Sequence, residues 1–81
     1  MSLQVRWFAA ARDAAGQPSQ TAEAGRPLAQ TLADLIGPNP ELASVVAHST
    51  FLVDGARRQA DDPTPLVDGA TIDVLPPFAG G

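Results

Sequence analysis

The residues with the clearest chemical potential are the last six, Pro76-Pro77-Phe78-Ala79-Gly80-Gly81. Gly80 and Gly81 carry no side chain beyond a hydrogen atom, so a terminal carboxylate on Gly81 would end a thin segment that could enter a slot in another protein. Pro76 and Pro77 fix φ and lack an N–H, so they end the preceding strand and stiffen the base of the segment. A frayed terminus is the ordinary explanation of such an end, but fraying does not require this order of residues. We therefore expect residues 76–81 to form an extended, flexible tail that works through its main-chain terminus.

Side chains suited to catalysis or metal binding are scarce. The chain has no cysteine, which excludes disulfides, thiolate catalysis and cysteine-ligated metals. His48 is the single histidine, and we expect it at the end of a helix, where it complements the helix dipole. Asp61-Asp62 lie in a proline-rich loop and are more typical of a solvated turn than of a carboxylate pair for Mg²⁺. No phosphate loop, nucleophile elbow or zinc spacing is present, and we predict no metal site.

Composition narrows the class of protein further. With 81 residues and 44% hydrophobic residues, the chain is expected to form one modest core. Its net charge is −4, and its five basic residues are all arginines. A nucleic-acid backbone is therefore not an expected partner, and the pair Arg57-Arg58 is too small a basic patch to change this conclusion. The acidity instead suits a basic partner protein. We expect a cytoplasmic protein, since there is no signal-peptide layout, no disulfide and no apolar run near the ~20 residues that span a bilayer.

The elements that would position the tail can be predicted from periodicity and turn signals. Residues 3–8 alternate as a half-buried strand in which Phe8 falls on the polar side. A possible edge strand covers residues 19–23, and residues 50–53 form a strand that Asp54-Gly55 turns into a short return strand at residues 57–60. Leu66 is expected to anchor the following loop on the core. After an Asp68-Gly69 turn, the final strand covers residues 71–75.

Helices are expected between these strands. Residues 9–15 form a short helical turn that Gly16 closes. Pro27 suits the first position of the main helix, which has no good N-cap side chain and whose apolar stripe is Leu28, Leu32, Leu35 and Ile36. Gly37-Pro38 ends that helix. Asn39 then caps a second short helix with Pro40 at its first position.

This order predicts an α+β roll, in which a mixed sheet of about five strands is covered on one face by helices. The domain would span residues 1–75 and the tail residues 76–81. If the first and last strands are neighbours, Phe8 and Leu75 lie together on the uncovered face. Such a patch beside a tail is a plausible docking site, although a loop could equally cover Phe8.

The chain resembles the small subunit of molybdopterin synthase, a family of β-grasp, ubiquitin-like sulfur carriers. The resemblance rests on the opening Val5-Arg6-Trp7-Phe8 with Arg12 and Gly16, on residues 65–75, and above all on the ending Leu75-Pro76-Pro77-Phe78-Ala79-Gly80-Gly81. Gly-Gly alone is common to ubiquitin-like carriers, whereas Pro-Pro-x-x-Gly-Gly directly after the final strand is narrower. Phe78 departs from the family, which more often has a smaller β-branched residue there.

The resemblance implies a carrier whose chemistry takes place on Gly81. An adenylating partner would use ATP to attach AMP to the Gly81 carboxylate, and a sulfurtransferase would supply the sulfur that replaces AMP to give a thiocarboxylate. The carrier would then dock on the large synthase subunit, in a heterotetramer of two small and two large subunits, and donate sulfur to a cyclic pterin precursor to build the dithiolene. The chain itself would bind no cofactor and would not be an enzyme on its own, because the large subunit would supply the catalytic groups.

The resemblance also implies a set of partner-binding residues. Phe8, Arg12 and Leu75 would form part of the docking surface, with Arg12 offering a forked donor. Pro76 and Pro77 would lower the entropy cost of ordering the tail. Phe78 would anchor it at the mouth of the slot, and Ala79 and Gly80 would keep it narrow.

Other functions fit the same residues. The chain could be a sulfur carrier for thiamine or cysteine synthesis, although Pro76-Pro77 argues against the thiamine type. It could be a ubiquitin-like modifier that is joined to lysines of target proteins through Gly81. It could also be an interaction domain in which the tail has no role.

Overall fold

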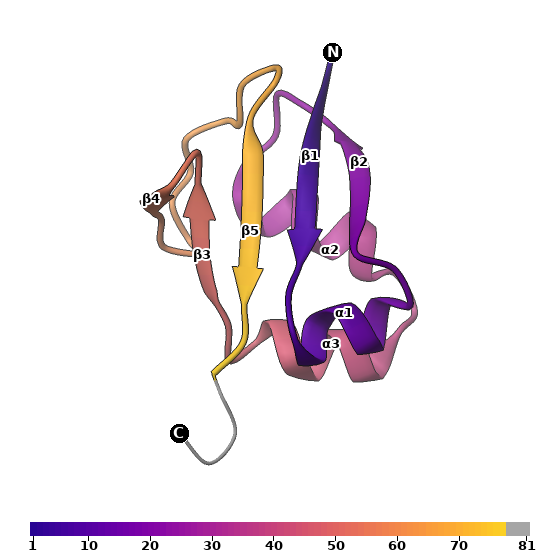
Figure 1. Ribbon diagram of the computed structural model, residues 1–81. Helices are drawn as coiled ribbons and strands as arrows, with labels where there is room; N and C mark the ends of the chain where they lie inside the picture. Colours follow the sequence, from indigo (N-terminus) through magenta and orange to yellow (C-terminus); the bar gives the residue numbers. More distant parts are fainter. Residues whose placement is uncertain (78–81) are drawn as a thin grey trace.

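The computed structural model describes residues 1–77 (Figure 1). Its elements follow one another in the order β1 (Ser2–Trp7), α1 (Ala10–Ala15), β2 (Ser19–Glu23), α2 (Leu28–Ile36), α3 (Pro40–Val46), β3 (Thr50–Val53), β4 (Ala56–Arg57) and β5 (Thr71–Leu75). The predicted strands and helices are all present. The predicted edge strand is β2, which lies at one edge of the sheet.

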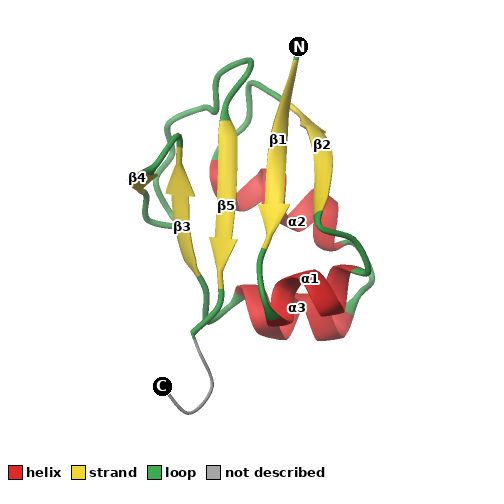
Figure 2. Cartoon of the chain, in the orientation of Figure 1, coloured by secondary structure: helices red, strands yellow, loops and turns green. Residues whose placement is uncertain are grey.

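Within residues 1–77 the strands form one five-stranded mixed sheet in the order β2-β1-β5-β3-β4. β1 and β5 pair in parallel at its centre, and the β1–β2, β3–β5 and β3–β4 pairs are antiparallel. The condition set above for a shared patch of Phe8 and Leu75, that the first and last strands are neighbours, is therefore met. This is the β-grasp arrangement, with α2 behind the sheet and α1 and α3 side by side at the end where β1 and β5 finish (Figure 2).

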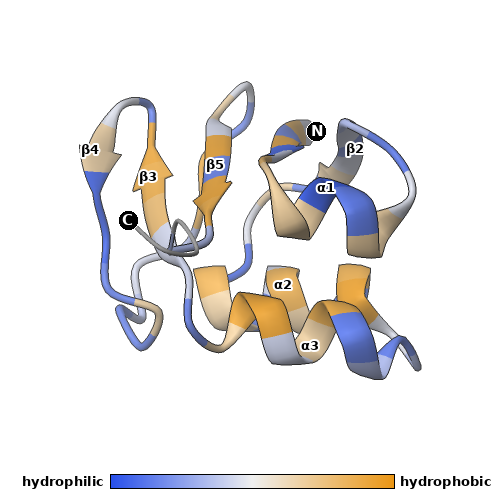
Figure 3. Cartoon of the chain, turned by 60° about the horizontal axis from the view of Figure 1, so that its bottom comes forward, coloured by the Kyte–Doolittle hydropathy of each residue, from blue (hydrophilic) through white to orange (hydrophobic). Residues whose placement is uncertain are grey.

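The core lies between the sheet and the helices because alternate strand residues point to the same side. Apolar colour follows β3, β5 and the facing parts of α2 and α3 (Figure 3). Leu66 is buried, which confirms its predicted role as the anchor of a long loop. The buried apolar residues are Leu3, Val5, Trp7, Ala11, Leu28, Leu32, Leu42, Val46, Phe51, Val53, Leu66, Ala70, Ile72 and Val74.

Two helix starts show how the sequence sets the boundaries. Pro27 is the N-cap of α2 rather than its first helical residue, so the predicted start was early by one residue. Its ψ of 157° is extended, and it supplies the carbonyl to which Thr31 N–H bonds at 3.0 Å. Asn39 caps α3 as predicted, because its side chain accepts a hydrogen bond from Leu42 N–H and Pro40 occupies the first turn.

The β3–β4 hairpin turns at Asp54-Gly55, as predicted. Both residues have positive φ, 50° and 84°, the combination that a two-residue type I′ turn needs. The return strand was predicted over residues 57–60, which is wrong: β4 covers only Ala56–Arg57. Arg58 N–H still bonds to the Phe51 carbonyl at 3.0 Å, but the chain then leaves the ladder as Asp62 N–H bonds to the Gln59 carbonyl in a new turn. The prolines that follow have no N–H with which to rejoin a sheet.

Candidate functional site

One face of the sheet is not covered by helices and is turned toward the viewer in Figure 1. We call it the open face. The register pairs Arg6 with Asp73 across β1 and β5, and pairs Asp73 with Leu52 across β5 and β3, so these side chains share this face. Its residues in the three central strands are Gln4, Arg6, Thr50, Leu52, Thr71, Asp73 and Leu75.

Phe8 extends the open face past the end of β1. Its N–H bonds to the Val74 carbonyl at 3.2 Å, which continues the parallel ladder by one residue. Phe8 is 37% exposed as a residue, so no loop among residues 1–77 covers it fully, and Leu75 is half-buried. The predicted grouping of Phe8 and Leu75 beside the end of β5 is therefore found, while its use as a docking surface stays a prediction.

Arg6 and Asp73 form a forked ion pair in the middle of this face. Arg6 Nε donates to Asp73 Oδ1 at 2.6 Å and Nη2 donates to Oδ2 at 2.9 Å. The Arg6 side chain is 52% exposed, whereas the Asp73 side chain is only 12% exposed. The hydrogen bonds from Arg6 to Asp73, together with the charge of that carboxylate, raise the pKa of Arg6. The guanidinium also lies over the Phe8 ring, 5.6 Å from its centroid, within the range of a cation–π contact.

Sequence reasoning missed this pair. The strand alternation placed Asp73 on the polar side, where a solvated carboxylate is expected, yet Asp73 is buried by its neighbours in the central strand. The sequence held a partial signal, because an arginine and an aspartate lie on the polar sides of the first and last strands, but it did not specify the register that pairs them. Opposite charges on adjacent strands favour each other when they are directly paired.

Arg12 is placed by α1, directly after Phe8. The Phe8 carbonyl accepts hydrogen bonds from Ala11 N–H at 3.0 Å and Arg12 N–H at 3.4 Å, so the helix begins immediately at the end of the open face. Gly16 closes it in the left-handed conformation with φ of 78° and donates its N–H to the Arg12 carbonyl. Arg12 is exposed, which agrees with its predicted docking role without testing it.

Ala9 adopts an unusual backbone at this same corner. Its φ is 50° and its ψ is −123°, a combination that side chains disfavour and that glycine adopts more readily. Such strain is held in place only when the surroundings determine the backbone. Here Phe8 is fixed by the ladder on one side, and Ala11 is packed in the core on the other.

The predicted tail begins inside the described part of the chain. Pro76 is buried and Pro77 is exposed, so the chain is still packed against the fold for one residue after β5. The other predicted tail residues, Phe78, Ala79, Gly80 and Gly81, lie outside the described residues. The roles predicted for residues 76–81 in partner binding and sulfur chemistry stay predictions.

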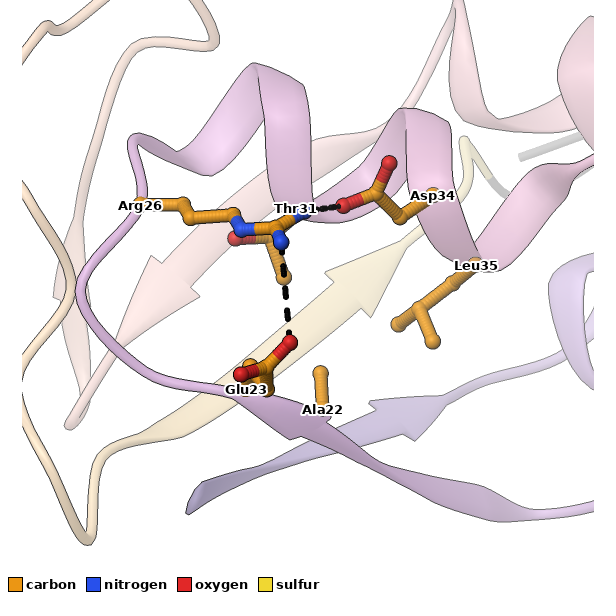
Figure 4. Close-up of a pocket in the computed structure, with 6 residues that line it drawn as sticks. All are labelled: Ala22, Glu23, Arg26, Thr31, Asp34 and Leu35. Carbon is orange, nitrogen blue, oxygen red and sulfur yellow. Dashed lines mark hydrogen bonds and ion pairs between the residues drawn. The ribbon is translucent and has the colours of Figure 1, made fainter. Parts of the chain in front are cut away.

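A small hollow lies between β2 and α2, away from the open face (Figure 4). Arg26 crosses its mouth, where Nη2 lies 3.5 Å from Glu23 Oε2 and Nη1 bonds to Asp34. Both ends of the guanidinium are thus engaged by carboxylates of the chain itself. The hollow is better explained as an ion-paired connection between a strand and a helix than as a binding site.

The remaining polar candidates have local partners. His48 Nδ1 lies 3.0 Å from the Ser44 carbonyl, at the end of α3 where it was expected. Hydrogen bonds from the hydroxyl and N–H of Thr64 to Asp62 lower the pKa of that carboxyl group. Arg58 is half-buried, and its Nη1 has no hydrogen-bond partner within the described residues. In residues 1–77 no three histidine or acidic side chains gather as a metal site would require.

No helix in the described range is both long and apolar enough to cross a membrane.

Comparisons with known proteins place these features in context. The chain is 32% identical over 83 residues to the molybdopterin synthase sulfur carrier subunit of Chlamydomonas reinhardtii, and the match covers 100% of both chains. Small archaeal modifier protein 1 of Methanosarcina acetivorans is 26% identical with a TM-score of 0.81, over 99% of this chain and 96% of that one. A chain in the complex of subunits 1 and 2 of molybdopterin-converting factor from Helicobacter pylori is 22% identical with a TM-score of 0.69 over 100% of both chains, which shows a shared fold. No family model matches the chain.

Proposed function

The chain belongs to the family of molybdopterin synthase sulfur carrier subunits, and we propose that it carries sulfur on the carboxylate of Gly81. The observation that carries this proposal is the full-length identity of 32% to a curated member of that family. The open face adds support, because apolar and basic side chains that are exposed or half-buried lie at its end, next to the point where the chain leaves β5. Phe8, Arg12 and Leu75 are these side chains.

The proposed cycle begins with activation. A carboxylate is a poor electrophile because its charge is delocalised over two oxygens. An adenylating partner transfers AMP from ATP to the Gly81 carboxylate and releases pyrophosphate, which creates a good leaving group. Sulfur that a sulfurtransferase supplies at the sulfide level then attacks the carbonyl carbon and AMP departs, so that one carboxylate oxygen has been replaced by sulfur.

Transfer follows on a second partner. The large synthase subunit binds the carrier, and the thiocarboxylate sulfur attacks a cyclic pterin precursor to form a thioester. Water then cleaves the bond between the Gly81 carbonyl carbon and the sulfur, so that the sulfur stays on the pterin and the carrier leaves with its carboxylate restored. Two carriers in turn supply the two sulfurs of the dithiolene, in a complex of two small and two large subunits. The acid–base groups belong to the large subunit, since this chain offers a docking face and a terminus rather than an active site.

A two-step experiment tests the proposal. The full chain is first incubated with the activating enzyme, ATP and a sulfur source, and intact-mass spectrometry is expected to show one oxygen replaced by sulfur. The product is then mixed with the large subunit and pterin precursor, and molybdopterin is expected to form. A chain lacking Gly80 and Gly81 is the control and should give neither product. Molybdopterin formed from the truncated chain would contradict the proposal.

The likeness to small archaeal modifier protein 1 favours a second candidate, a protein modifier joined to target lysines through Gly81. The composition provides a sharp test, because this chain contains no lysine. A modifier of this sequence would form conjugates with other proteins but could not build chains on its own side chains. Denaturing blots of cells that express the tagged protein distinguish the two candidates: a ladder of conjugates indicates a modifier, and the free protein alone indicates a carrier.

A further inference from the structure

The forked pair at the centre of the open face leaves part of Arg6 unused. Asp73 engages one edge of the guanidinium through Nε and Nη2. The end-on edge carries one hydrogen of Nη1 and the second hydrogen of Nη2, and the remaining hydrogen of Nη1 points back toward the aliphatic part of the side chain. This second edge meets no acceptor within residues 1–77, and the side chain is half exposed.

We propose that this second edge of Arg6 recognises a carboxylate on the protein that takes up the C-terminal segment. Arg6 is then a specificity-determining residue of the carrier. This inference rests on the proposed function, and it commits to the large synthase subunit as the occupant of the open face. A guanidinium can hold one carboxylate on each edge, because both edges have the spacing of two carboxylate oxygens.

The surroundings of Arg6 explain why an oxygen acceptor is required. Phe8, Leu52 and Leu75 place apolar groups around the pair, so a partner that covers the face removes water from it. A purely apolar partner would leave three N–H groups of Arg6 buried without acceptors, which is costly for a charged group. A carboxylate on the end-on edge accepts from two of them in the bidentate geometry. Asp73 and the Phe8 ring hold the guanidinium in place, so little freedom of Arg6 is lost on binding.

Long-range and local electrostatics predict opposite effects for the loss of Arg6. The chain has a net charge of −4, which suits a basic partner. If only the overall charge mattered, Arg6→Gln would make the chain more acidic and would tighten binding. If Arg6 pairs with a carboxylate, the same substitution weakens binding.

Titration calorimetry of the full chain with the purified large subunit from the same organism measures the Kd of each variant and so decides between these two predictions. Arg6→Gln is expected to raise Kd by roughly 30-fold or more, as for a desolvated charge pair. Arg26→Gln is the matched control, because it makes the same change of net charge at an ion-paired arginine away from the open face. Its Kd should stay within about threefold of wild type.

The double variant Arg6→Gln/Asp73→Asn separates recognition from folding. It keeps the net charge of −4, since one positive and one negative charge are removed, and it leaves no lone carboxylate in the sheet. Urea unfolding checks that it folds, and it should bind as weakly as Arg6→Gln.

The possible outcomes are separable. Wild-type affinity in either Arg6 variant would overturn the inference and leave the proposed function intact. A wild-type chain that does not bind the large subunit would overturn both.

Discussion

Asn39 joins two helices through one side chain, and its replacement gives a quantitative test of the fold that carries the site. Its Oδ1 accepts from Leu42 N–H at 3.0 Å and caps α3, while its Nδ2 donates to the Ala14 carbonyl at 3.0 Å and holds α1. Asn39→Ala removes both contacts. Loss of the cap costs about 1 kcal/mol and loss of the bond to Ala14 about another 1 kcal/mol. We therefore expect the free energy of unfolding to fall by about 2 kcal/mol.

Asn39→Ser divides this loss into its two parts. Serine can accept from Leu42 N–H as an N-cap, but its side chain is too short to reach Ala14. We expect Asn39→Ser to lose about half as much stability as Asn39→Ala. Both variants lose the bond that holds α1, so amide exchange should become faster in that helix and stay closer to wild type in β5. This helix matters for the site because it carries Arg12.

Urea unfolding followed by tryptophan fluorescence is a suitable assay, since Trp7 is the only tryptophan and is 2% exposed. A loss of about 2 kcal/mol corresponds to a fall in Tm of roughly 8–16 °C for a domain of this size. Equal losses of stability in the Ser and Ala variants would show that the cap contributes nothing and that the bond to Ala14 accounts for the whole effect. A loss below about 0.5 kcal/mol in Asn39→Ala, typical of a plain surface substitution, would refute the reasoning.

Three further predictions follow from other parts of the fold. Ala9→Gly should raise the free energy of unfolding by about 1 kcal/mol, because relief of the strain at a φ of 50° exceeds the entropy cost of glycine; a destabilised variant in urea unfolding would contradict this. Ile72→Ala should cost about 3 kcal/mol or more, because Ile72 is fully buried in the central strand, and the urea midpoint measures it; a loss under about 1 kcal/mol would mean that the core closes over the cavity. The lowered pKa of Asp62 means that its carboxylate stabilises the fold above the unfolded pKa of about 4 and that this contribution is lost as the pH falls through the lower folded value. The stability advantage of wild type over Asp62→Asn should therefore shrink as the pH drops below about 4, and an advantage that grows with acid would contradict the assignment.

Local signals in the sequence were enough to predict most elements of the fold. The cap and proline at Asn39-Pro40 and the turn at Asp54-Gly55 depend on residues within one or two turns of each other, so a single sequence reveals them. The placement of β1 beside β5 was only a condition of the sequence analysis, and the structure meets it. The expected patch of Phe8 and Leu75 is a consequence of that pairing.

The features that could not be predicted depend on contacts distant in sequence or on backbone strain. The ion pair of Arg6 and Asp73 joins residues 67 positions apart, and its fork depends on a register that no single sequence specifies. The positive φ of Ala9 is imposed on a residue that does not favour it. β4 ended early because the turn after it, rather than the propensity of residues 58–60, decides where the ladder stops.

The register of β1 against β5 links the core to the proposed docking face. A shift by one residue would turn Asp73 toward the core and Ile72 and Val74 toward solvent, because side chains alternate along a strand. The buried apolar residues oppose such a shift on one face, and the fork of Arg6 on Asp73 opposes it on the other. The same register sets Phe8 beside the end of β5. The residues that hold the central strands together therefore also fix where the proposed docking face lies relative to Pro76, the start of the C-terminal segment.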